Sequence, residues 1–262
     1  MTRPKPDSNP SNPIMGGAKR TRPSAVVLDN VGLRYGRGPE ILTDVNLDLP
    51  NGSFSFLTGP SGAGKSSLLK LCYMALTHSR GRITLFGQDT SRLDNASSQI
   101  LRRRIGVVLQ DFTLIDHLSV FENVALPLRV AGLNRQHYSQ DVIELLQWVG
   151  LGHRMAAYPQ TLSGGEKQRA AIARAVIAKP NFLIADEPTG NVDPEIARRL
   201  LRLFAEMNRV GTTVLIATHD THLIQEIDAR VIRIENGRVF KGAPIKSEQE
   251  DSSIETKDEP NA

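Results

Sequence analysis

Cysteine and tryptophan each occur once in this chain of 262 residues, aromatic residues are few, and no long apolar run is present. A lone thiol cannot form a disulfide within the chain, so we expect Cys72 to be a small buried residue in a reducing compartment. A membrane-spanning helix needs about 18 or more consecutive apolar residues, and a signal peptide needs an apolar N-terminal core. The sequence predicts neither. We therefore expect a cytosolic protein that meets a membrane only peripherally or through a partner.

Neither sign of charge dominates strongly. The formal net charge is +4 and the sequence pI is about 9.3, an excess that a few terminal residues can account for. We therefore expect no nucleic-acid partner. The apolar fraction of 40% is ordinary for a folded chain, and the length suits one large α/β domain or two small ones.

The two ends differ in composition from the centre. Residues 1–23 are rich in Pro, Asn and Gly and carry five basic side chains, which predicts a disordered basic arm. Residues 244–262 are acidic and are also predicted to be disordered. The folded domain should therefore span residues 24–243. Met15 is an alternative start that the sequence leaves open.

Short apolar or β-branched runs alternate with helical patterns between these ends. The predicted strands are Ala25–Leu28, Ser53–Thr58, Ile83–Leu85, Ile105–Leu109, Phe182–Ala185, Thr213–Thr218 and Val231–Glu235. The predicted helices are Lys65–Ala75, Gln140–Val149, Glu166–Ala178 and Pro194–Asn208. This alternation indicates an α/β core of parallel strands with helices on both faces. Residues from about 111 to 170 show helical patterns without a convincing strand, which predicts a helical insertion.

A glycine-rich segment follows the strand predicted at Ser53–Thr58 and opens the next helix. It reads Gly59-Pro60-Ser61-Gly62-Ala63-Gly64-Lys65-Ser66, matches the pattern G-x-x-x-x-G-K-[ST], and is followed by Ser67 in the predicted nucleotide site. In such a loop, backbone N–H groups and a helix N-terminus surround phosphate oxygens. Lys65 would reach the β- and γ-phosphates, and the Ser66 hydroxyl would bind Mg²⁺. A glycine-rich turn that only caps a helix is the alternative, and the acids described next argue against it.

Polar side chains follow three of the predicted strands. Asp186 and Glu187 end an apolar strand, Gln110 follows Ile105–Leu109, and His219 follows Thr213–Thr218. Ligands of parallel sheets bind outside the carboxyl ends of the strands, so these side chains should gather beside the phosphate loop. Asp186 and Gln110 suit the shell of a Mg²⁺ ion, Glu187 suits a general base, and His219 could hydrogen-bond the γ-phosphate. A solvated strand end is the structural alternative for each of them.

A second glycine-rich helix start reads Leu162-Ser163-Gly164-Gly165-Glu166. Ser163 and Glu166 have the spacing of a capping box, which is a sufficient structural reason for both. A cap does not explain two adjacent glycines, which leave the N–H groups of a helix start open to an anion. This site lacks a lysine and a metal ligand of its own. We therefore expect it to complete the nucleotide pocket of another subunit.

Taken in this order, these motifs resemble the ATP-binding cassette (ABC) ATPases over residues 25–240. The resemblance implies a P-loop NTPase fold with a mainly parallel core, an antiparallel β subdomain and a helical subdomain. It also implies a homodimer that holds two ATP molecules, each between the phosphate loop of one subunit and Ser163 and Gly165 of the other. Tyr35 matches the aromatic residue that stacks on adenine, although packing is an equally good reason for it. Asp193 matches an acid of the subunit interface and also has the position of a helix N-cap.

Local stretches such as residues 56–65, 101–112 and 120–129 look like the FtsE family of bacterial cell-division ATPases. That likeness implies ATP and Mg²⁺ as ligands, an integral membrane partner of the FtsX kind, and a peripheral place on the cytoplasmic face of the inner membrane. ATP-driven dimer closure would then regulate cell-wall hydrolysis through the partner. Residues 72–81 and the long arm depart from the family pattern. Two alternatives stay open: the ATPase of a lipoprotein-release or efflux transporter, and a division scaffold that needs little turnover.

Overall fold

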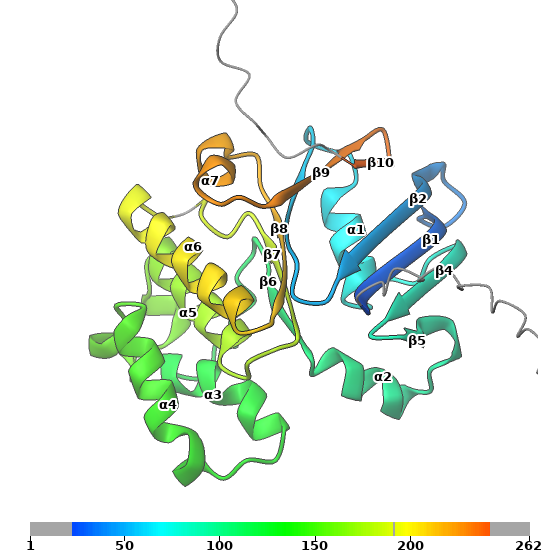
Figure 1. The fold of residues 1–262 in the computed structure, drawn as a ribbon. Helices are drawn as coiled ribbons and strands as arrows, with labels where there is room; N and C mark the ends of the chain where they lie inside the picture. Colours follow the sequence, from blue (N-terminus) through cyan, green and yellow to red (C-terminus); the bar gives the residue numbers. More distant parts are fainter. Residues whose placement is uncertain (1–22, 191, 242–262) are drawn as a thin grey trace, which may run out of the picture.

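Two β-sheets and a group of helices form the part of the chain that the computed structural model describes, residues 23–190 and 192–241 (Figure 1). The predicted tail and all of the predicted arm except Pro23 lie outside this part.

The larger sheet has six strands in the order β10-β9-β3-β8-β7-β6. Its strands are β3 (Phe54–Thr58), β6 (Ile105–Val108), β7 (Phe182–Asp186), β8 (Thr213–Ala217), β9 (Arg230–Glu235) and β10 (Arg238–Lys241). All neighbours pair in parallel except β10, which returns antiparallel along β9. The predicted parallel core is confirmed, with strand ends within one residue of those expected from the sequence. Only β10 was missed.

A separate antiparallel sheet has the order β2-β1-β4-β5. It consists of β1 (Ser24–Arg34), β2 (Glu40–Pro50), β4 (Arg80–Leu85) and the two-residue β5 (Gln88–Asp89). The strands predicted at Ala25–Leu28 and Ile83–Leu85 therefore belong to this sheet and not to the parallel core. In β2, which was not predicted, buried Val45, Leu47 and Leu49 alternate with exposed residues. That alternation is typical of an antiparallel strand with one wet face.

Seven α-helices lie in the described part of the chain. They are α1 (Lys65–Cys72), α2 (Asn95–Arg102), α3 (Val120–Val130), α4 (Arg135–Trp148), α5 (Gly164–Val176), α6 (Pro194–Arg209) and α7 (Thr221–Glu226), with short 3₁₀ turns at Thr90–Arg92, Gly152–Arg154 and Pro159–Thr161. Helix α1 ends three residues before the predicted Ala75, because Met74 adopts a positive φ of 58°. None of these helices has the length and apolar character needed to cross a membrane.

Side chains on the two faces of the parallel sheet enter different cores. On one face, Phe182 and Ile184 pack in a cluster with α1 and the antiparallel sheet. On the other face, Leu183 and Ala185 pack against α5 and α6. The prediction of helices on both faces is therefore corrected on one side, where a second sheet shares the cover with α1.

The chain between β6 and β7 is helical. Helices α3 and α4 pack on α5 through buried residues that include Val124, Val142 and Leu146, and these form a third core. The described residues contain no strand between Val108 and Phe182. Because α5 also packs on the parallel sheet, it joins this helical part to the sheet (Figure 1).

Gly106 marks a close approach of β6 to α5. A Cβ atom at this position would lie 2.3 Å from the Ala175 carbonyl oxygen, so Gly106→Ala must move the strand or the helix. We expect the substitution to lower the free energy of unfolding by about 1–3 kcal/mol, the usual cost of overpacking. Urea unfolding measures the change. Gly190→Ala is the matched control, because its Cβ would meet only Glu187 O at 3.7 Å. An equal midpoint for the two variants would contradict the close contact.

Candidate active site

A cavity of about 690 Å³ lies at the carboxyl ends of the parallel strands. The phosphate loop forms one side of it, and residues that follow β6, β7 and β8 form the other. Its lining residues are Ile41, Gly59, Pro60, Ser61, Gly62, Gly64, Lys65, Ser66, Ser67, Gln110, Asp186, Glu187 and His219. The structure thus brings together nearly all of the phosphate loop and the four polar residues predicted at strand ends.

The loop backbone requires glycine where it approaches neighbouring strands. Gly59 has φ 152°, and a Cβ atom there would lie 2.1 Å from the Ile234 carbonyl oxygen. Gly64 is the N-cap of α1 with φ 105°, and a Cβ atom there would meet Leu42 at 2.7 Å. The Lys65 ammonium donates hydrogen bonds to Gly59 O at 2.7 Å and to Pro60 O at 3.1 Å. The loop and the start of α1 therefore form a cationic concavity that fits a phosphate chain.

Asp186 is the buried acid of the site, and it carries a hydrogen bond from the Ser66 hydroxyl. Burial raises the pKa of its carboxyl group, and the neighbouring Glu187 adds to the rise, while the Ser66 bond and nearby lysines oppose it. A bound cation would compensate this burial. The oxygens of Ser66, Gln110 and Asp186 are ligands that Mg²⁺ accepts, and phosphates commonly supply the others. The donor set therefore fits a magnesium ion shared with a nucleotide.

Glu187 follows β7 with a positive φ of 47°, and its amide donates to Ala217 O at 2.9 Å. Its carboxylate accepts from Thr218 Oγ1 at 3.2 Å and lies 2.8 Å from Nδ1 of His219. Both contacts come from the end of β8, so two adjacent strands determine where this carboxylate lies. The hydrogen bond with Glu187, and then its negative charge, raise the pKa of the exposed His219.

The second glycine-rich start lies outside this cavity. Ser163 is the N-cap of α5, and the capping box is complete: Ser163 N donates to Glu166 Oε2 at 2.8 Å, and Glu166 N donates to Ser163 Oγ at 3.2 Å. The backbone bond from Ser163 is the main reason that the pKa of Glu166 is lowered. Ser163 and Gly164 are exposed. Ser163 therefore has the structural role of a helix N-cap, and the surface of the glycines remains open to another molecule.

Other predicted site residues also lie apart from the cavity lining. Tyr35 is 46% exposed, and its hydroxyl lies 3.2 Å from Ser67 Oγ. Asp193 is the N-cap of α6 and accepts from Ile196 N at 3.0 Å, which is the capping role foreseen for it. Ala63 is buried in the core beside α1. None of the three lines the cavity.

Sequence reasoning missed two residues of the site, Ile41 and Thr218. Ile41 lines the cavity from β2, a strand that was not predicted. Thr218 positions Glu187 and was taken only as the last residue of a strand. Its place directly before His219 was the available signal, because a strand-end hydroxyl can reach the neighbouring strand end.

The fold and the site define a P-loop ATPase. The chain belongs to the ABC transporter family, whose model matches residues 42–190, and it is an ATP-binding and ATP-hydrolysing member of it. The solved dimeric structure of an ATP-binding cassette in a post-hydrolysis state, bound to ADP and Pi, is similar to it. The TM-score is 0.79 at 32% sequence identity, over 85% of this chain and 99% of that one.

Within the ABC transporter family, the chain is similar to curated FtsE proteins. The cell division ATP-binding protein FtsE of Escherichia coli is 44% identical over 214 residues, which are 82% of this chain and 96% of that protein. FtsE of Mycobacterium tuberculosis is 41% identical over 82% of this chain and 94% of that protein. FtsE of Streptococcus pneumoniae is 39% identical over 83% and 95%. The likeness to FtsE stated from the sequence is confirmed.

The contact between Glu187 and His219 predicts a pH dependence. Glu187 stabilises the charged imidazole, so the pair is strongest below the pKa of His219 and weakens as the pH rises through it. We expect Glu187→Gln to lower the pKa of His219 toward its ordinary value, as measured by NMR titration of the ring protons. Glu195→Gln, an exposed acid outside the cavity, is the control. An unchanged titration in Glu187→Gln would show that the pair does not form in solution.

Proposed function

We propose that this chain is the ATPase subunit of an FtsEX-like complex, in which ATP-driven closure of a dimer acts on a membrane partner. One observation carries the proposal. The phosphate loop, Glu187 and His219 share one cavity, while the helix start at Ser163–Gly165 lies outside that cavity on the same chain. A site divided in this way is complete only when a second subunit supplies the missing part.

Each group in the cavity has a separate part in hydrolysis. Lys65 and the loop amides hold the β- and γ-phosphates of ATP, and Glu187 accepts a proton from the attacking water. Thr218 and His219 orient the Glu187 carboxylate, and His219 can also donate to the γ-phosphate. Ser66, Gln110 and Asp186 would hold Mg²⁺, which when bound neutralises charge on the phosphate oxygens.

In this proposal, the second glycine-rich helix start, at Ser163–Gly165, binds the nucleotide of the sister subunit. The dipole of α5 and the open N–H groups of Gly164 and Gly165 favour an anion, and Ser163 adds its hydroxyl. The γ-phosphate of ATP can bridge the two subunits, and ADP lacks it. ATP therefore favours the closed dimer and hydrolysis favours its release. The similar solved cassette, described as dimeric with ADP and Pi, supports this arrangement.

A membrane partner of the FtsX kind would convert closure into regulation of cell-wall hydrolysis during division. The support is the identity with FtsE proteins over most of the chain. The ATPase would then act at the cytoplasmic face of the inner membrane. We assign much of the partner-facing surface to residues 111–130, the loop after Gln110 and helix α3.

Lys65→Ala should abolish tight ATP binding or turnover, because among the described residues it removes the only side-chain ammonium that lines the cavity. Steady-state phosphate release and equilibrium ATP binding measure the effect. Lys70→Ala is the matched control, since Lys70 is an exposed lysine of the same helix outside the cavity lining. ATPase activity undiminished by Lys65→Ala would refute the assignment of the loop.

Glu187→Gln should lower kcat by roughly 10² to 10⁴, the contribution of a positioned general base, and leave ATP-dependent dimerisation intact. Turnover assays and analytical ultracentrifugation with ATP or ADP separate the two effects, and Glu195→Gln is the control. If the ATP-loaded Glu187→Gln protein stays strictly monomeric at high concentration and with its membrane partner, the proposal of a nucleotide site shared by two subunits is refuted. Rescue of a division defect by this variant would contradict the need for turnover.

A further inference from the structure

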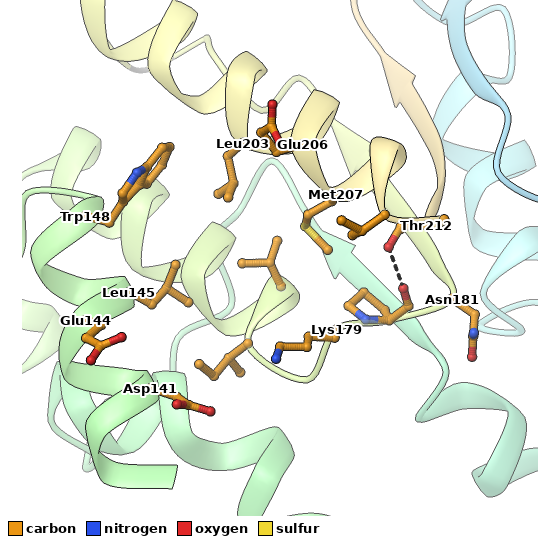
Figure 2. Close-up of a pocket in the computed structure, with 15 residues that line it drawn as sticks. Asp141, Glu144, Leu145, Trp148, Lys179, Asn181, Leu203, Glu206, Met207 and Thr212 are labelled. Atoms are coloured by element: carbon orange, nitrogen blue, oxygen red, sulfur yellow. Dashed lines mark hydrogen bonds between the residues drawn. The ribbon is translucent and has the colours of Figure 1, made fainter.

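A second cavity, of about 790 Å³, lies between α4 and α6 (Figure 2). Asp141, Glu144 and Trp148 line it from α4, and Leu203 and Met207 line it from α6. Its floor includes the residues before β7 and β8, where Thr212 Oγ1 donates to Pro180 O at 2.9 Å. The cavity therefore opens at the amino ends of the strands, and the nucleotide cavity lies at their carboxyl ends.

The lining combines apolar side chains with unneutralised acids. Leu145 and Trp148 face the cavity from α4, and Trp148 is 37% exposed. Asp141 and Glu144 form no ion pair within residues 23–190 and 192–241, and Lys179 is the single basic residue of the lining. Glu206 on α6 is the third acid of the lining, and it forms an ion pair with Arg209. The cavity thus favours an occupant that is basic and partly apolar.

The described chain begins beside this cavity. Pro23 O accepts a hydrogen bond from Asn51 N at 2.9 Å. The next residue, Gly52, accepts from Asn208 Nδ2 at 3.0 Å and donates to Thr213 Oγ1 at 2.9 Å. Residues 210–212, which lie between these two partners, form part of the cavity rim. Residues 1–22 therefore continue from a point close to the cavity.

We propose that residues 1–22 of this chain bind in the cavity between α4 and α6. Lys19, Arg20 and Arg22 are opposite in charge to Asp141 and to Glu144, whose carboxylate also accepts a hydrogen bond from Gln140 Nε2 at 2.8 Å. Ile14 and Met15 supply apolar side chains for the wall formed by Leu145, Trp148 and Leu203. The occupant is thus a segment of the same chain.

The length of residues 1–22 and their covalent attachment to the domain both favour this occupant. A chain extends by at most about 3.3–3.6 Å per residue, so Met15 can lie up to about 26–29 Å from Pro23. A tethered segment binds at an effective concentration on the order of millimolar, so contacts too weak for a separate peptide suffice. Four prolines in residues 1–22 also limit the conformational entropy that binding removes.

Trp148 reports on the cavity directly, because it is the only tryptophan of the chain. Ala18→Cys provides a labelling site, since the native Cys72 is fully buried and burial raises its pKa to about 12. A nitroxide at residue 18 of the full chain should quench Trp148 emission, and reduction of the label should restore it. Raising salt from about 0.1 M to about 1 M shortens the screening length from about 10 Å to about 3 Å and should weaken the quenching.

Charge exchange tests the contact. Asp141→Lys with Glu144→Lys should abolish the quenching, and adding Lys19→Glu, Arg20→Glu and Arg22→Glu to that variant should restore it. Asp29→Lys with Asp228→Lys is the matched control, because both acids are exposed and lie outside the lining. ATPase activity should stay unchanged in all of these proteins, which separates this test from that of the proposed function.

Three results would overturn the proposal. Absence of quenching in the labelled full chain would show that the arm lies elsewhere. Quenching that survives Asp141→Lys with Glu144→Lys would show that it does not depend on these acids. Quenching that grows with protein concentration would assign the cavity to the arm of a second copy.

Discussion

Parallel pairing of β3, β8, β7 and β6 is the constraint on which the active site depends. Parallel strands place their carboxyl ends at one edge of the sheet, and each of these four strands continues into a segment that lines the nucleotide cavity. Residues far apart in the sequence, such as Lys65 and His219, therefore line the same cavity. The buried side chains of both sheet faces hold this edge in place.

Backbone geometry at the strand ends then sets the orientation of the acids. Asp186 is the last residue of β7 and remains buried, whereas Glu187 turns into the left-handed region and directs its carboxylate toward Thr218 and His219. Two consecutive acids thus occupy different environments. Burial raises the pKa of Asp186, whereas the carboxylate of Glu187 forms a hydrogen bond with the exposed imidazole of His219 and raises its pKa. Different environments suit the separate tasks of metal ligand and base.

Helix α5 connects the two halves of the proposed dimeric site. The helix starts with Gly164 and Gly165. One turn later, Gln168 donates to Pro188 O at 2.8 Å, next to Glu187. Farther along, Arg174 donates to Phe112 O and Thr113 O in the loop after Gln110, where both residues have positive φ. Burial lowers the pKa of Arg174. In the proposed dimer, contact of a sister subunit's nucleotide with α5 would therefore affect the segments that carry Glu187, the proposed base, and Gln110, a proposed metal ligand.

The sequence by itself determined the local features: the phosphate loop, the parallel strands with their terminal polar residues, and the N-caps at Ser163 and Asp193. These depend on short-range patterns, such as glycine spacing and the distance from Ser163 to Glu166, that can be read without knowing what packs on them. The functional roles of these residues stay predictions. Only the tertiary structure decided that Ala25–Leu28 joins an antiparallel sheet, that Ile41 reaches the cavity, and that Thr218 holds Glu187. Each of these depends on which strands become neighbours, and long-range pairing leaves no signature in any single segment.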